Sequence, residues 1–272
     1  MCGAKVLHTD FCMASMTRIY ELAAYTDELL GTDEVPDYPA ALNGLQLENR
    51  SAIKGIAAAV DVSTRAIDGA VRVGANLLIV HHGMFWGGLE QLRGASYQRL
   101  RTLLEHDIAV YSSHLPLDRH PTIGNNVLLA NELGLRPTGT FADYGGFFIG
   151  VSGESDVETS ALVQRAKKFA TAFSGEVRVT PITQGRRTKR WGMCTGAGAS
   201  SETLKEAGRM KIDTLIVGEG PHHTAVQAEE SGLAIIYAGH YATETLGVRA
   251  LAEHLGEKYG IPANFVNAPT GL

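Results

Sequence analysis

The sequence predicts an α/β protein of mixed α+β arrangement, built from two domains of similar topology. Three observations predict this class. Short apolar runs alternate with stretches of helical periodicity, few hairpin signals separate them, and one half of the chain resembles the other. At 272 residues the chain is long enough for two domains of ordinary size.

Composition excludes several classes of protein. The chain has 44% hydrophobic and 19% charged residues and a net charge of -5, which is typical of a globular protein without a basic surface for nucleic acid. Its three cysteines form no CxxC pair, so we expect neither a disulfide framework nor a thiolate zinc site, and we expect a cytoplasmic location. No apolar run approaches the roughly 20 residues that span a bilayer, so we expect no membrane partner.

Regular structure is expected to begin near Thr17, which can cap a helix running to Gly31. Residues 1–16 show no periodicity and are predicted to be disordered or artificial. A first α/β domain is expected over 17–135, completed by 240–272, and a second over 136–239.

The first half then shows two strand and helix pairs. Residues 55–61 form an apolar run typical of a buried strand, and Ser63 can cap the helix that follows to Val73. The run Leu77–Val80 predicts a strand buried on both faces. A further helix is expected over 97–105 and a strand over 108–113.

The second half shows the same alternation. The following elements are expected in order: a strand over 147–152, a helix over 156–169, a β pair over 176–182 and 190–195, a helix from Ser201, a strand over 214–217, a helix over 241–259 and a strand near Phe265.

An internal repeat relates the two halves. Residues 63–83 align with 200–220 without a gap, and YSSHLPLD from Tyr111 aligns with YAGHYATE from Tyr237. In these alignments His82 falls on Glu219, His114 on His240, and Asp118 on Glu244. We therefore expect each half to deliver a histidine and a carboxylate from the end of a strand, where open α/β sheets build their sites.

These residue types point to metal ions. His81 and His82 end a buried strand, and His240 and Glu244 are four residues apart at a helix start, which places both on one face. Carboxylates can bridge two cations, as imidazole cannot. His81, His82, Asp118, His240 and Glu244 thus have the composition of a dinuclear centre for two divalent ions of Zn, Fe, Mn, Co or Ni.

The residue pattern alone allows other roles for these side chains. Adjacent strand residues point to opposite sides, so one imidazole of the pair could be a buried structural group. An ordinary exposed i,i+4 pair is the alternative interpretation of His240 and Glu244. His114 could orient a ligand instead of being one.

Four segments also carry a family resemblance. They are NGLQ from Asn43, HHGMFW from His81, SHLPLDRHPTIGNN from Ser113 and GHYATETLGV from Gly239. Together they resemble the signature blocks of the Nif-three-like dinuclear metal-centre proteins, also named GTP cyclohydrolase I type 2 homologues. The resemblance covers the chain from about Thr17 to its C-terminus.

The resemblance implies that His81, His82, Asp118, His240 and Glu244 ligate two metal ions, that two interlinked domains share a topology, and that subunits assemble as a toroidal hexamer. The interval from Asp118 to His240 leaves no room for the domain that some relatives insert there, which implies the short form. The His pair in GEGPHH departs from the family pattern.

The leading functional hypothesis is a metal-dependent hydrolase acting on a purine nucleotide or a similar small polar substrate. A bound metal acidifies water, and Glu219 is the candidate general base. Two other classes compete with it: a metal-handling protein, such as a metallochaperone, store or insertase, and a ring-shaped regulatory scaffold. Turnover that follows metal content would favour the enzyme.

Overall fold

Two compact units make up the chain in the computed structural model, which describes residues 7–88 and 90–272, and only the backbone of residues 7–18. Unit 1 comprises Met1–His114 and Val248–Ala268, and unit 2 comprises Leu115–Gly247 and Pro269–Leu272. The chain therefore passes between the units more than once. The predicted domain limits differ from these, and whether either set of ranges folds independently stays a prediction.

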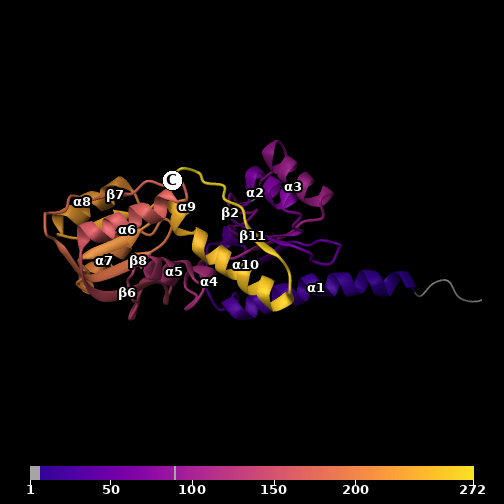
Figure 1. Cartoon of the computed structure of the whole chain (residues 1–272), viewed down its shortest axis with the longest axis horizontal. Coiled ribbons are helices and arrows are strands. Elements are labelled where there is room, and N and C mark those ends of the chain that lie inside the picture. The colour runs from indigo at the N-terminus through magenta and orange to yellow at the C-terminus, as the bar shows by residue number, and fades with distance from the viewer. Residues whose placement is uncertain (1–6, 89) are drawn as a thin grey trace, which may run out of the picture. The chain divides into compact units, whose positions relative to one another are not determined.

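Unit 1 contains a mixed five-stranded sheet in the order β1-β4-β3-β2-β11. Figure 1 labels β2 and β11 of this sheet. Its strands are β1 (Gly44–Leu47), β2 (Ile56–Asp61), β3 (Leu77–His82), β4 (Ala109–Ser112) and β11 (Ala263–Phe265). β11, β2, β3 and β4 are parallel, and β1 is antiparallel to β4. The elements outside the sheet are α1 (Leu7–Leu30), η1 (Pro39–Ala41), α2 (Thr64–Arg72), α3 (Ala95–Glu105) and the larger part of α10 (Thr245–Tyr259).

The core of unit 1 follows from its strand sequences. All six residues of β3 are buried, as predicted for an uninterrupted apolar run ended by histidines. Alternate residues of β2 and β3 pack against the side chains of α2 and α3. These helix side chains include Ile67 of α2 and Leu103 of α3. The predicted cap holds, because the Ser63 side chain accepts a hydrogen bond from the Ala66 backbone N–H at 3.2 Å.

Unit 2 contains a mixed six-stranded sheet in the order β5-β6-β8-β9-β10-β7. Its strands are β5 (Gly139–Tyr144), β6 (Phe147–Glu158), β7 (Arg178–Val179), β8 (Arg187–Cys194), β9 (Thr214–Val217) and β10 (Ala234–Tyr237). Its helices are α4 (Leu115–Asp118), α5 (Asn125–Glu132), α6 (Thr159–Thr171), α7 (Ser201–Arg209), α8 (His222–Glu230) and α9 (His240–Thr243).

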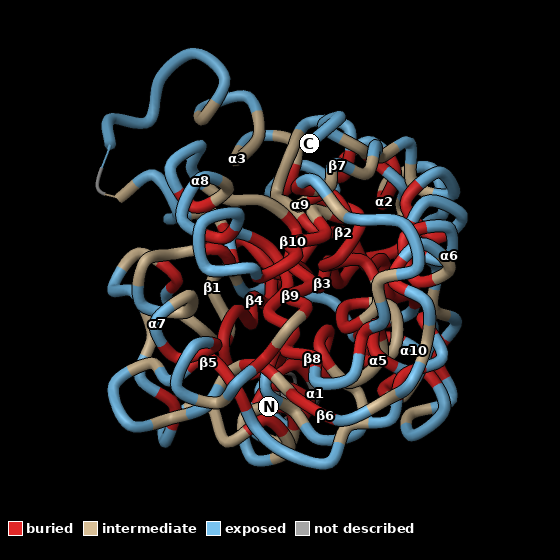
Figure 2. The backbone as a smooth tube through the Cα atoms, turned by 90° about the vertical axis from the view of Figure 1, so that its left-hand side faces the viewer, coloured by how far each residue is buried: buried red, intermediate tan, exposed pale blue. Residues whose placement is uncertain are grey.

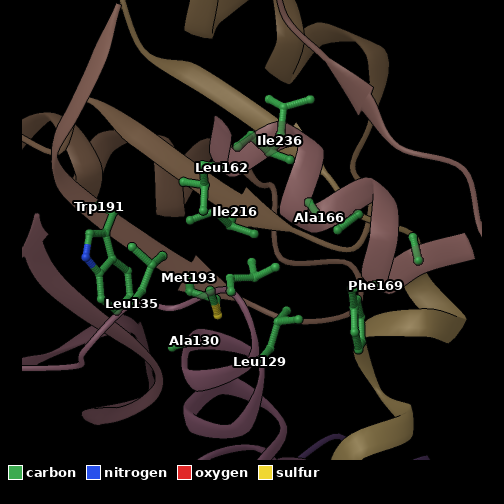
Figure 3. Packing of buried hydrophobic residues seen from close by; sticks show 14 of the residues in the cluster. Leu129, Ala130, Leu135, Leu162, Ala166, Phe169, Trp191, Met193, Ile216 and Ile236 are labelled. Atoms are coloured by element: carbon green, nitrogen blue, oxygen red, sulfur yellow. The ribbon is translucent and has the colours of Figure 1, made fainter. Parts of the chain in front are cut away.

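Helices cover both faces of the second sheet. Ile216 and Ile236 face α5 and α6, where Trp191 and Met193 complete one apolar cluster (Figure 3). Leu215, Val217 and Ile235 face the other way and pack with residues of α7 and α8. Figure 2 shows buried backbone along the central strands of each sheet and exposed backbone in most connections. Successive side chains of β9 point to opposite faces of the sheet, so this apolar strand contributes to the core on both faces.

Four strands of each sheet share one connection pattern. β8, β9 and β10 are parallel and adjacent, as β2, β3 and β4 are, and α7 lies between the first two as α2 does in unit 1. The strand before each set, β7 or β1, is antiparallel to the last of its three. Strand order thus agrees with the two similarly wound halves that the sequence predicts.

Several predicted boundaries were wrong. α1 begins at Leu7 rather than at Thr17, since no glycine or proline interrupts the residues between them. Residues 1–6 of the predicted disordered N-terminus lie outside the described residues. The predicted helix over 241–259 is two helices, α9 and α10, with Glu244 as the C-cap of the first.

The predicted hairpin over 176–195 was also wrong. β7 pairs with β10, and β8 pairs with β6 and β9, so the two segments are not partners. The hairpin in this unit is β5 with β6, which meet through Gly145 and Gly146, both at positive φ. Positive φ at these two positions favours glycine. The sequence contains this pair of glycines, but a glycine pair is equally common in loops that do not connect the strands of a hairpin.

None of the helices in the described part of the chain is long and apolar enough to cross a membrane.

Candidate metal centre

Three histidines of unit 1 converge at the carboxyl ends of β3 and β4. His81 and His82 close β3, and His114 follows β4 by two residues. One nitrogen of each ring lies within 4.8 Å of those of the other two, and all three residues are buried. The adjacent His81 and His82 rings have centroids 4.8 Å apart, although both residues belong to β3. The expectation that neighbouring imidazoles diverge therefore does not hold here.

Each of these rings is oriented through Nδ1. The Nδ1 of His81 lies 2.9 Å from the Ser113 carbonyl oxygen, and that of His82 lies 2.8 Å from Asp61 Oδ1. The Nδ1 of His114 lies 2.8 Å from Asp37 Oδ1. Bonds of this kind fix the tautomer with the proton on Nδ1, so Nε2 is the nitrogen that would bind a metal.

The NGLQ segment supports the histidines from the side of β1. Asn43 Oδ1 accepts a hydrogen bond from the His114 backbone N–H, and its Nδ2 donates to Asp37 Oδ2. Gln46 Oε1 accepts a hydrogen bond from the Met84 N–H at 2.7 Å, two residues after His82. Asn43 and Gln46 thus hold the segments that follow β4 and β3.

Unit 2 gathers its candidate residues at the ends of β9 and β10. His240 Nε2 lies 3.1 Å from Glu244 Oε2, so the two residues meet although a helix break separates them. His240 Nδ1 lies 2.7 Å from Glu219 Oε1, on the segment after β9. Glu219 therefore orients His240 as Asp61 and Asp37 orient their histidines. Whether it also acts as a base stays a prediction.

Asp118 is buried at the end of α4. Its Oδ1 accepts hydrogen bonds from Asn125 Nδ2 at 2.8 Å and from Thr195 Oγ1 at 3.3 Å. Asn125 Oδ1 in turn accepts from the Gly247 N–H, and Asn126 Oδ1 accepts from the Thr195 N–H. The two asparagines of the IGNN segment thus tie Asp118 to β8 and to the start of α10.

Gly196 gives Glu244 its space. A Cβ at this position would lie 2.1 Å from Glu244 Oε1, and the residue has a positive φ of 61 degrees. Its N–H also donates to Thr243 Oγ1 at 3.1 Å. Any side chain here would displace the Glu244 carboxylate and strain the backbone.

Negative charge accumulates in this part of unit 2. Burial raises the pKa of the Cys194 thiol, and the charges of Asp118, Glu244 and Glu206 raise it further. Carboxylates gathered beside a buried thiol favour a cation over an anion. Cys194 itself is a free, buried cysteine.

His240 carries a proton in the metal-free state at neutral pH. Burial lowers its pKa, but hydrogen bonds to and the charges of Glu244 and Glu219 outweigh that effect and raise the pKa to about 9. The imidazolium is therefore held between two carboxylates, in the position that a cation would take.

The donor set fits transition metals. Imidazole nitrogens with carboxylate oxygens suit Zn, Fe, Mn, Co and Ni, whereas an all-oxygen set would suit Mg or Ca. The buried histidine cluster of unit 1 is able to hold a metal ion, and its rings carry the outer hydrogen bonds that metal-binding histidines have in general.

Sequence reasoning missed some of these residues. Asp61 is the last residue of β2, which is parallel to β3, and it lies opposite His82. A carboxylate at the end of the preceding predicted strand could therefore have been proposed as a partner of His82. Asp37 lies in a loop 77 residues from His114, and no local pattern marks it. His120 Nδ1 accepts from the Thr122 and Ile123 N–H groups, so it shapes a turn.

Fold and site together define an α/β protein with a candidate transition-metal site built from histidines and carboxylates at strand ends. The chain matches the Duf34/NIF3 (NGG1p interacting factor 3) family over residues 17–269, and it belongs to this family.

Curated relatives agree with that assignment. The chain is 39% identical to the GTP cyclohydrolase 1 type 2 homolog of Deinococcus radiodurans, over 93% of this chain and 94% of the relative. It is 41% identical to the protein of the same name from Pyrococcus horikoshii, over 93% and 98%. These coverages leave no room for a large insertion, as the short form requires.

Solved structures share the fold. Protein ybgI, described as of unknown function, superposes with a TM-score of 0.84 at 34% identity, covering 94% of this chain and 100% of that one. TTHA1606 from Thermus thermophilus superposes with a TM-score of 0.78 at 33% identity, covering 93% and 99%.

Proposed function

We propose that the protein is a dinuclear metal-dependent hydrolase of the GTP cyclohydrolase 1 type 2 kind, acting on a purine nucleotide or a similar small polar substrate. His81, His82, Asp118, His240 and Glu244 would hold two divalent transition metal ions, and His114 joins them as a sixth candidate ligand. The observation that carries the proposal is the repeated Nδ1 bond, which directs Nε2 of four histidines as metal ligation requires.

Chain connectivity keeps two of the candidate ligands near one another. His114 is the last residue of the first segment of unit 1, and Asp118 lies only four residues further along in unit 2. Four residues of extended chain span at most about 14 Å, so these two Cα atoms are held near one another by covalent geometry.

The residues have separate tasks in this proposal. Asp61, Asp37 and Glu219 hold their histidines in place, while Asp118 and Glu244 supply the anionic oxygens that can bridge two cations. When bound, the ions supply a Lewis acid and activate water for hydrolysis. Glu219 is the candidate base, since 44% of its side chain is exposed and a substrate or water could therefore reach its carboxylate.

Two substitutions at Glu219 separate orientation from proton transfer. Glu219→Gln keeps an oxygen that accepts from His240 Nδ1 but removes the base, so metal content should stay and turnover should fall about 100-fold or more. Glu219→Ala removes both and should lower metal affinity as well. Unchanged turnover in Glu219→Gln would remove the base from the proposal.

The direct test combines metal analysis with turnover. Protein purified without chelator should contain about two transition metals per chain, and His81→Ala with Glu244→Ala should remove them. His106→Ala, at an exposed histidine after α3, is the control. Formate release from GTP and hydrolysis of a panel of nucleotides and phosphoesters should follow metal content. Full metal without turnover of any of them would move the function to metal handling.

Assembly and location complete the proposal. The resemblance implies a toroidal homo-hexamer, and light scattering on the purified protein should give about six times the chain mass of 29.1 kDa. A monomer at micromolar concentration would contradict it. The cysteine usage supports a reducing cytoplasm as the location.

A further inference from the structure

A cavity of about 450 Å³ opens beside His82 and lies wholly within unit 1. It is bounded by the ends of β2 and β3, by the segment that follows His82 and by the first turns of α3. This volume falls within the range of small-molecule sites. Because a candidate metal ligand forms part of its wall, a molecule bound here would adjoin the candidate centre.

One wall of the cavity is aromatic. The Trp86 ring centroid lies 4.7 Å from that of His82 and 4.6 Å from that of His114, so the indole packs on the histidine cluster. Phe85 and Trp86 nevertheless remain 38% and 39% exposed, and Met84 lies beside them. Two large aromatic side chains kept in contact with solvent next to a cavity provide a surface for stacking.

The aromatic wall is held in place by the polypeptide. Gln46 accepts from the Met84 N–H and donates to the carbonyl oxygens of Ala41 and Leu42. A Cβ at Gly83 would lie 2.2 Å from the Gln46 side chain, so glycine allows this close approach. The start of the segment that carries Phe85 and Trp86 is therefore fixed to the neighbouring strand region.

The cavity lining also includes the polar residues Glu90, Ser96 and Arg99. Ser96 Oγ donates to Glu90 Oε1 at 2.6 Å, and Arg99 donates to Ser96 Oγ at 3.3 Å. Arg99 brings further N–H donors and Glu90 a carboxylate acceptor, so this part of the lining offers both kinds of hydrogen-bonding group. A ring edge that carries a carbonyl acceptor for Arg99 and two adjacent N–H donors for the Glu90 carboxylate complements it, as the edge of guanine does and that of adenine does not.

We propose that this cavity binds a planar nitrogen heterocycle of the substrate, stacked on Trp86 and read at its polar edge by Arg99 and Glu90. This rests on the proposed function, because it places the ring beside the candidate metal ligand His82. Stacking gives affinity for any such ring, and Arg99 with Glu90 favours rings with an amide edge over rings without one.

Calorimetric titration tests the proposal with three probes: guanosine, whose ring has an amide edge, adenosine, whose ring lacks one, and ribose 5-phosphate, which has no such ring. We expect guanosine to bind more tightly than adenosine and ribose 5-phosphate not to bind. Trp86→Leu should weaken both nucleosides about tenfold or more, and Trp86→Phe should restore most of the affinity. Arg99→Met should weaken guanosine more than adenosine.

Tyr97→Leu is the matched control, since Tyr97 is an exposed aromatic on α3 outside the cavity lining, and it should change none of these affinities. Equal binding of guanosine by wild type and Trp86→Leu would overturn the proposal, as would wild-type protein that binds neither nucleoside. Each titration is run with and without chelator, and metal content is measured for every variant. Absence of metal from the wild type contradicts the proposed function, whereas metal without ring binding contradicts this inference.

Discussion

Carboxylates that contact histidines rather than metal set the geometry of the candidate centre. Asp37 is the most buried of them, with 6% of its side chain exposed, and it accepts hydrogen bonds from His114 and Asn43. Partners of this kind typically change metal affinity by about 10- to 100-fold when they are removed. Metal binding should therefore depend on these partners as well as on the ligands.

Asp37→Ala should lower metal affinity by about 10- to 100-fold, because the His114 ring loses the group that fixes its orientation and tautomer. Chelator competition measures the change. Asp68→Asn removes an exposed carboxylate from α2 and serves as the control. Metal affinity equal to that of wild type in Asp37→Ala would mean that His114 does not bind metal.

Metal binding should strengthen as pH rises from 7 to about 9, because a metal must displace the proton that His240 carries in the metal-free state. The sign for folding is the opposite. A raised pKa stabilises the metal-free fold fully below about pH 6.5, and this contribution is lost as pH rises through about 9.

Chelator competition over this pH range measures the first effect. Glu219→Gln removes one charge that raises the His240 pKa, so its affinity curve should lie at lower pH. A curve that is flat above pH 7 would show that His240 binds metal without losing a proton, which contradicts its assignment as a ligand.

Two turns next to β8 contain a glycine at positive φ, Gly196 after the strand and Gly185 before it. Gly196→Ala should reduce metal binding, since its methyl group would meet Glu244 Oε1 at 2.1 Å. Gly185→Ala is a matched control: Gly185 also has positive φ, at 75 degrees, but a Cβ there would meet only open space within 4 Å. Both should lose roughly 1 kcal/mol of unfolding free energy to backbone strain.

Metal analysis and thermal unfolding together separate the two effects. Only Gly196→Ala should lose metal, while both should unfold at a lower temperature. Equal metal content in the two variants would show that the Glu244 carboxylate can shift away from a methyl group at position 196. Glycine at this position would then be required only for the backbone conformation of the turn.

Local signals made most elements predictable from sequence. β3 and β9 are short apolar runs, and Ser63 and Ser200 both cap helices. Partners distant along the chain were not predictable. β7 pairs with β10 rather than with β8, and no residue of β7 indicates which strand is its partner.

The candidate site shows the same division. The histidines at the end of β3 and the spacing of His240 and Glu244 are visible in the sequence, because both lie within one element or one turn. The partners that orient these side chains come from other elements. Asp37 and Asn125 act through contacts that only the folded chain creates.

The whole chain carries two donor sets, one in each compact unit, and family membership links them to proteins named GTP cyclohydrolase 1 type 2 homolog. The repeated strand order gives each unit the means to present a histidine oriented by a carboxylate. The proposed function depends on the claim that these donors hold two divalent transition metal ions per chain.

A crystal structure of protein purified without chelator, with anomalous scattering recorded at the absorption edges of the candidate metals, tests that claim most directly. We expect two anomalous peaks per chain about 3.5 to 4 Å apart, in contact with side chains of the proposed ligands His81, His82, Asp118, His240 and Glu244. A single ion held by His81, His82 and His114 alone, or two ions too far apart to share a carboxylate, would contradict it.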